Sequence, residues 1–266
     1  MAAVLFAYLI RHVMCNEVLI DIGDCLASRG ALMTLAPKQE VVDDVLNAMV
    51  RMLTNASQRS CWFLPTTIMQ AALGGRSLTS ANMTSIRNSY MRSKVDHTTR
   101  VYQPMWCDQY WYLMIIDVPR MKLENRNASG GKTRHCSHFH KADWQNGKLT
   151  SLALYLESLT LGKSWLSGPD AMRPRFSTFE FEEQDVPQQQ GDSMDCGVWV
   201  AQWMIREHLW QDYGVQITMV ISEILFQHVN NATRMRLAVD LVTKSYNELA
   251  EDAVAKAFRH WQRIAI

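Results

Sequence analysis

The spacing of hydrophobic residues changes along the chain, and each spacing predicts a different kind of element. From Glu40 to Leu53 apolar residues recur every three or four positions, which predicts an amphipathic helix. From Tyr110 to Val118 the run is almost continuously apolar and rich in aromatic and β-branched residues, which is typical of a buried central strand. Pro119 ends that run.

The other segments extend this pattern to the whole chain. Helices are predicted over residues 21–35, 80–91, 149–161 and 195–209, with two more between residues 217 and 257. Strands are predicted at residues 101–106 and 176–181, and the polar stretches 124–149 and 187–193 are predicted loops. Helices followed by a few strands and then by helices favour an α+β or mixed α/β domain. A doubly wound nucleotide-binding fold is not expected, because the sequence has no Gly-rich phosphate loop.

Composition narrows the class of protein. The chain has 266 residues, of which 48% are hydrophobic and 20% charged, so it can bury a sizeable core. The formal net charge of +1 provides no overall field to attract nucleic acid, and no nucleic-acid partner is predicted. The apolar run Met1–Ile10 is too short to span a bilayer and has no basic segment before it, so no membrane association is predicted.

Cysteine usage predicts a reduced environment. The six cysteines are scattered and contain no CxxC pair, which favours free thiols over a disulfide framework in a chain of this length. We therefore expect a nuclear or cytoplasmic protein.

The stretch that carries the most chemical information runs from Gln188 to Val200. A polar loop delivers Cys196 to the first turn of a predicted apolar helix, where the helix dipole favours a thiolate, the nucleophilic form of the side chain. Gly197 leaves space beside the sulfur for a substrate carbonyl. The amide of Gln190, together with the Cys196 backbone N–H, would form a two-donor oxyanion hole. The alternative is that Cys196 is a buried structural thiol and Gln190 a solvated loop residue.

Gln190 followed by Asp195-Cys196-Gly197 and an apolar helix resembles the nucleophile motif of the ubiquitin-like-protein-specific cysteine proteases. These are the de-SUMOylating peptidases, which include a plant mobile-element-associated branch. Residues 29–35 and 42–47 resemble the substrate-binding helices of that family, and residues 101–118 resemble its strand with the catalytic histidine and the tryptophan after it.

The resemblance implies an α+β, papain-like cysteine protease fold. Its N-terminal part would be helical, followed by a small central mixed sheet and a helical C-terminal part. The protease domain would cover residues 20–266, and residues 1–19 would form an N-terminal extension.

The resemblance also assigns roles to residues. Cys196 would be the nucleophile, Gln190 the oxyanion donor and Trp111 one wall of a tunnel for a Gly-Gly tail. Tyr110 occupies the position of the family's histidine base, and Asn127, seventeen residues later, occupies that of its aspartate. A tyrosine phenol, with an ordinary pKa of ~10, is neutral at pH 7 and is a poor general base.

Two further positions, Val41 and Asp44, bear on how a substrate would be bound. Val41 lies where relatives often have a tryptophan that helps to close the tunnel. Asp44 would contact a ubiquitin-like substrate, or it is an ordinary solvated helix acid. The implied reaction is cleavage after the C-terminal Gly-Gly of a SUMO-type modifier, with no metal or organic cofactor. The alternative is a catalytically impaired pseudo-protease that binds the modifier without cleaving it.

The densest cluster of possible metal ligands is the segment from His135 to His140. On an extended segment His138 and His140 would share one face and could supply half of a zinc site. The alternative, which we prefer, is a polar loop that contains several histidines by chance, because the sequence has no second paired cluster.

Overall fold

The computed structural model describes residues 2–11, 14–75, 78–107, 109–128, 148–184, 186, 189, 193–212, 229–244 and 246–264. Its contacts divide the chain into two compact units. One comprises Met1–Asn55 and Asp192–Ile266, and the other is Ala56–Gly191. Each unit is described by itself below.

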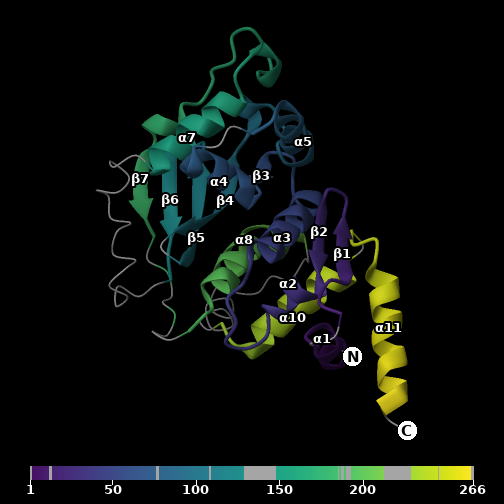
Figure 1. The fold of residues 1–266 in the computed structure, drawn as a ribbon. Helices are drawn as coiled ribbons and strands as arrows, with labels where there is room; N and C mark the ends of the chain where they lie inside the picture. The colour runs from purple at the N-terminus through teal and green to yellow at the C-terminus, as the bar shows by residue number, and fades with distance from the viewer. Residues whose placement is uncertain are drawn as a thin grey trace. The chain divides into compact units, whose positions relative to one another are not determined.

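The first unit is mainly helical and carries one β-hairpin. Its elements, labelled in Figure 1, are α1 (Ala2–Leu9), β1 (Val18–Ile22), β2 (Cys25–Ser28), α2 (Arg29–Met33), α3 (Asp43–Ala56), α8 (Cys196–Asp212), α10 (Asn231–Thr243) and α11 (Ala250–Ile264). β1 and β2 are antiparallel, and α1 packs against both α10 and α11.

An ion-pair cluster ties the N-terminal part of this unit to its last helix. Glu17 accepts a hydrogen bond from Arg29 Nη2 at 2.6 Å and another from Lys256 Nζ at 2.9 Å. Burial raises the pKa of Glu17, but the hydrogen bonds from Arg29 and then Lys256 outweigh it, so that the pKa lies below its ordinary value. Glu17 therefore stays ionised in the folded protein at neutral pH.

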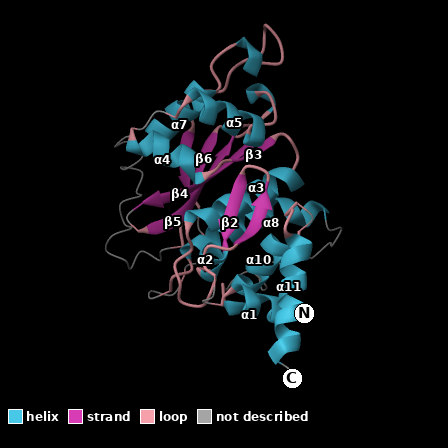
Figure 2. Ribbon diagram, turned by 45° about the vertical axis from the view of Figure 1, so that its right-hand side comes forward, coloured by secondary structure: helices cyan, strands magenta, loops and turns pink. Residues whose placement is uncertain are grey.

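The second unit contains a five-stranded mixed sheet in the order β3-β4-β5-β6-β7, drawn in magenta in Figure 2. Its strands are β3 (Cys61–Phe63), β4 (Arg100–Cys107), β5 (Tyr110–Asp117), β6 (Lys122–Arg126) and β7 (Glu180–Glu183). β4, β5 and β6 are antiparallel neighbours, whereas the β3/β4 and β6/β7 pairs are parallel. Every residue of β5 is buried, as expected for the central strand.

Helices and short 3-10 turns accompany the sheet. They are α4 (Thr66–Gly74), α5 (Ser80–Tyr90), η1 (Val95–His97), α7 (Lys148–Leu159), η2 (Lys163–Trp165) and η3 (Phe176–Thr178). α4 packs against both β4 and α7.

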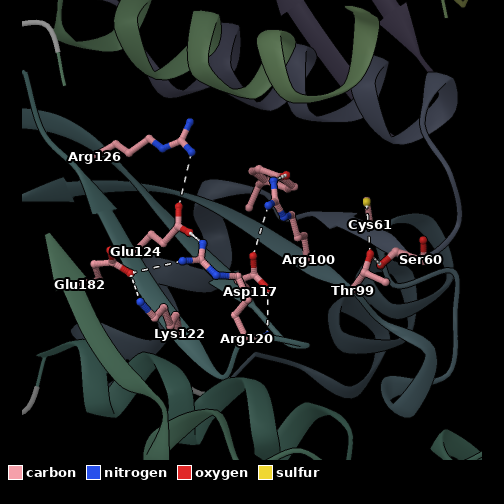
Figure 3. A network of polar contacts seen from close by, with 11 residues as sticks. Ser60, Cys61, Thr99, Arg100, Asp117, Arg120, Lys122, Glu124, Arg126 and Glu182 are labelled. Atoms are coloured by element: carbon pink, nitrogen blue, oxygen red, sulfur yellow. Dashed lines mark hydrogen bonds and ion pairs between the residues drawn. The ribbon is translucent and has the colours of Figure 1, made fainter. Parts of the chain in front are cut away.

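A network of charged side chains links strands β4 to β7 (Figure 3). Arg100 pairs with Asp117 across β4 and β5 at 3.2 Å, and Lys122 pairs with Glu182 across β6 and β7 at 2.6 Å. The buried carboxylate of Glu124 is paired with Arg120 at 3.1 Å and with Arg126 at 3.4 Å. Because each buried carboxylate in this network has a cationic partner, the network is compatible with burial and supports the strand register.

Most of the predicted elements are confirmed. The helix predicted over residues 40–53 is α3, and those predicted over 80–91, 149–161 and 195–209 are α5, α7 and α8. The strands predicted at 101–106 and 110–118 are β4 and β5. Of the two helices predicted between residues 217 and 257, the structure shows α10 and α11, while residues 213–228 lie outside the described part.

Three predicted elements need correction. Residues 21–35 do not form one helix, because β1 and β2 form a hairpin around Gly23, and the helix α2 begins only at Arg29. The strand predicted at 176–181 is a 3-10 turn followed by β7, since β7 begins at Glu180. The predicted loop 124–149 begins too early, because β6 continues to Arg126.

No helix in the described part of the chain is both long enough and apolar enough to cross a membrane.

Candidate active site

Cys196 is the first residue of α8. The Trp199 N–H donates to the Asp195 carbonyl at 2.9 Å, which is the first backbone hydrogen bond of the helix. The Cys196 thiol therefore lies at the helix end whose dipole stabilises an anion. Cys196 is buried, with 5% of the residue surface exposed. Gly197 follows it and is also buried.

Arg234 of α10 fixes the segment that leads into this helix. Its Nε donates to Asp195 Oδ1 at 2.7 Å, and its Nη2 donates to the Met194 carbonyl at 2.7 Å. The other Asp195 oxygen accepts a hydrogen bond from the Ser193 hydroxyl. Three consecutive residues before Cys196 are thus held by one buried guanidinium and its carboxylate partner.

The same guanidinium also binds a second stretch of chain. It donates to the carbonyls of Thr34 and Ala36, both at 3.2 Å, and to that of Gln39 at 3.0 Å. Arg234 is only 1% exposed. A buried arginine with five acceptors is fully satisfied, so it joins residues 34–39 to the entry of α8 as one rigid connection.

Neither Arg234 nor the pairing role of Asp195 was predicted from the sequence. A signal was present, since Arg234 shares a helix face with Leu237, Ala238 and Leu241, at spacings of three, four and seven, and these three residues are buried. An arginine on the apolar face of a helix implies a buried partner. The partner itself, 39 residues away in sequence, could not be inferred from the pattern.

Tyr110 and Trp111 open the central strand β5 of the second unit and are 7% and 4% exposed. Tyr110 is directly opposite Cys107 on β4, and Trp111 is opposite Trp106. The two indole rings lie 4.9 Å apart between centroids, at an angle of 54°. Trp111 is therefore held in place by a neighbouring aromatic ring.

Asn127 follows the last residue of β6 and is partly exposed. The next residue, Ala128, accepts a backbone hydrogen bond from the Gln189 N–H at 2.8 Å. The chain immediately before Gln190 is thereby tied to the end of β6, beside Asn127. Gln190 itself lies outside the described residues.

Asp44 lies in the first turn of α3, where the helix dipole favours an acid. Its carboxylate is exposed, yet partial desolvation, with a smaller contribution from Asp43, raises its pKa. Val41, where relatives often carry a tryptophan, is buried with 1% exposure. Asp44 is therefore available for a partner, and Val41 is part of the core.

The predicted site residues divide between the two units. Cys196, Gly197 and Asp44 belong to the first, and Tyr110, Trp111 and Asn127 belong to the second. Among the described residues no group of three or more His, Cys, Asp or Glu side chains could hold a metal ion. The histidine segment 135–140 lies outside the described part of the chain.

Comparison by sequence finds no matching family model and no matching curated protein. Comparison of the fold gives several solved structures. The SUMO protease Ulp1 with its catalytic cysteine oxidised to a sulfenic acid has a TM-score of 0.60 at 14% identity, covering 92% of this chain and 94% of that chain. The C-terminal Ulp1 protease domain in complex with SMT3, the yeast ortholog of SUMO, has a TM-score of 0.60 at 17% identity, covering 91% and 94%.

The Chaetomium thermophilum Ulp1-like SUMO protease catalytic domain has a TM-score of 0.56 at 13% identity, covering 92% of each chain. These likenesses extend over nearly the whole of both chains in each pair. The predicted α+β class is confirmed, and the chain has the fold of Ulp1-type protease domains.

Proposed function

We propose that this chain is a cysteine peptidase of the ubiquitin-like-protein protease type. It would cleave the bond after the C-terminal Gly-Gly of a SUMO-type modifier. The observation that carries the proposal is the position of Cys196, which opens α8 behind a segment fixed by Arg234, in a chain with the Ulp1-type fold. A thiol at a helix N-terminus, preceded by a segment that is held in place, is suited to nucleophilic attack.

In the proposed reaction the Cys196 thiolate attacks the carbonyl carbon of the last glycine. The tetrahedral oxyanion is stabilised by the Cys196 N–H and the Gln190 amide, and collapse expels the amine and leaves a thioester. Water then attacks the thioester, which releases the modifier's carboxylate and restores the thiol. Trp111 and Gly197 would flank the extended Gly-Gly tail.

Tyr110 and Asn127 limit the proton transfers in this scheme. Tyrosine at the base position does not accept the thiol proton readily at pH 7, and the asparagine then has no imidazole to orient. Loss of one member of such a unit lowers turnover by ~10⁴–10⁶-fold. A cysteine nucleophile is less affected than a serine, because a few per cent of an ordinary thiol is ionised at neutral pH. We therefore propose slow turnover.

A modifier carrying a C-terminal vinyl sulfone tests the nucleophile directly. The wild-type chain should form a covalent adduct at Cys196, located by peptide mass spectrometry, and Cys196→Ser should form none. An adduct at another cysteine, or no adduct with a chain shown to be folded by circular dichroism, would contradict the assignment.

The second candidate is a pseudo-protease that binds a ubiquitin-like modifier without cleaving it. The replacement of both proton-transfer positions, by Tyr110 and Asn127, favours it. The test compares the wild type with the double variant Tyr110→His/Asn127→Asp. If both bind the modifier saturably and neither releases a Gly-Gly-linked reporter, the chain is a binding protein and not a peptidase. The relation to the plant mobile-element-associated branch remains a prediction from sequence.

A further inference from the structure

An open cavity of about 580 Å³ is present in the second unit, to which all of its described lining residues belong. It is lined by the C-terminal half of α5, the residues that follow it, and the turn η2. Its size is in the range of small-molecule sites, which is roughly 300–1,000 Å³. Three cationic side chains line it, Arg87, Arg92 and Lys94, and no carboxylate is among the lining residues that the structure describes.

Arg87 and Lys94 are held in position by neutral groups. Arg87 Nε donates to the Leu159 carbonyl at 2.9 Å, and its guanidinium carbon lies 5.9 Å from the Trp165 ring centroid. Lys94 Nζ donates to the carbonyl of Ser164. The bond to the Leu159 carbonyl uses one of the five N–H donors of Arg87. The two Nη groups of Arg87 are oriented by the neighbouring indole of Trp165.

The electrostatic balance of the cavity is positive. No carboxylate of the described chain lies within ion-pair distance of Arg87 or Lys94. The nearest acid in sequence, Asp96, accepts hydrogen bonds from the Ser167 N–H at 3.1 Å and from the Ser167 hydroxyl. Bonds to backbone carbonyls orient a cation but do not neutralise it, so the described lining of the cavity favours an anionic ligand.

We propose that this cavity binds the phosphoryl group of a small phosphorylated ligand. Arginine forks match phosphate oxygens in pairs, a lysine adds a point charge, and hydroxyl and amide groups supply further donors around them. Trp165 provides an apolar wall for the organic part of the ligand. The proposal is independent of the peptidase chemistry, because all of the residues involved belong to one unit.

A purely structural role is the alternative. Basic residues near a helix C-terminus stabilise the helix dipole, and their bonds to carbonyls could simply tie α5 to the neighbouring turns. That role predicts a loss of stability on mutation with no dependence on an added anion. The two explanations therefore differ in a measurable quantity.

Pyrophosphate is the probe, titrated into the full chain by calorimetry and by thermal unfolding at constant ionic strength. The wild type should bind it and gain thermal stability as its concentration rises. Arg87→Gln/Lys94→Gln should weaken binding at least ~10-fold, equivalent to about 1.4 kcal/mol. Arg59→Gln, which removes an exposed charge from the same unit outside the cavity, should leave binding unchanged.

Lys94→Gln alone is the second variant, because Lys94 is exposed and a substitution there should change stability little. It should weaken pyrophosphate binding several-fold while the unfolding temperature without ligand stays near that of the wild type. Absence of binding to the folded wild type at millimolar pyrophosphate would overturn the proposal. Undiminished binding by the double variant, or equally tight binding of a triglutamate peptide, would also overturn it.

Discussion

Replacing Arg234 by methionine removes the guanidinium but keeps a long apolar stem on α10. The change leaves the Asp195 carboxylate without its cation and removes the donor from four backbone carbonyls. Breaking a buried ion pair by deleting one partner costs roughly 3–5 kcal/mol. The Asp195 side chain is 22% exposed and can be partly rehydrated, so we expect a value near the lower end, about 3 kcal/mol.

Urea unfolding followed by circular dichroism measures this loss, and thermal unfolding gives a second estimate. At ~2–4 °C per kcal/mol for a chain of this size, the midpoint should fall by roughly 6–12 °C. Arg236→Met is the matched control, because Arg236 is on the same helix, its side chain is 75% exposed, and among the described residues it forms an ion pair with Asp240 alone, at 3.6 Å. That control should change stability by less than ~0.5 kcal/mol.

The same variants separate stability from positioning. Arg234→Lys restores the charge beside Asp195, but one ammonium cannot reach five acceptors, so it should recover only part of the stability. The rate at which a modifier vinyl sulfone labels Cys196 should follow the order wild type, Lys, Met at a temperature where all three are folded. Equal unfolding free energies for Arg234→Met and Arg236→Met, or unchanged labelling in the folded Arg234→Met variant, would refute the role given to Arg234.

Three other outcomes can be checked independently. Glu17→Gln should destabilise the chain by about 1–3 kcal/mol at pH 7. Because the pKa of Glu17 is lowered in the folded state, this difference in unfolding free energy, measured by urea titration, should vanish as the pH falls through that pKa. A difference that stays constant with pH would contradict the ion pair. Burial, then the Asp24 charge, raises the pKa of the Cys25 thiol to about 12, so iodoacetamide at pH 8 should modify exposed Cys15 and spare Cys25 in peptide maps. The double variant Tyr110→His/Asn127→Asp should raise cleavage of a Gly-Gly-linked reporter by ~10² or more, and no increase in a folded variant would show that more than the proton shuttle is missing.

The elements that sequence predicted well are those whose hydrophobic pattern is local. The central strand β5 is almost continuously apolar up to its last residue, Asp117, because both of its faces are buried, and α3 has a clear apolar face. The hairpin of β1 and β2 was missed because the apolar residues around it also fit a helical spacing. Gly23, with φ of 67°, marks the turn between Ile22 and Cys25, and a Gly-Asp pair between two short apolar runs was the available signal.

The strands β6 and β7 could not be predicted from apolar periodicity, since charged residues occupy much of them. On β6, Lys122, Glu124 and Arg126 alternate along one face; Glu124 pairs with Arg126 on the same strand, while Lys122 pairs with Glu182 on β7 and Arg120 precedes the strand. β7 is at the edge of the sheet that the structure describes, beside β6, so its polar residues do not conflict with burial. The ion pairs that make these strands stable exist only after the chain has folded, which is why the sequence there is typical of a loop.

The candidate site shows the same division between local and distant information. The cysteine at the start of a helix and the tryptophan at the start of a strand are local features, and both lie where they were predicted. The position of Tyr110 is set by the register of β4 and β5. These strands are paired continuously from the Arg100/Asp117 pair to the Cys107/Tyr110 pair. A histidine introduced at residue 110 would therefore occupy a strand position that the neighbouring pairs already define. Arg234, by contrast, binds partners from two segments that are distant in sequence, residues 34–39 and 194–195. These contacts form only in the folded chain, so no spacing along the sequence predicts them.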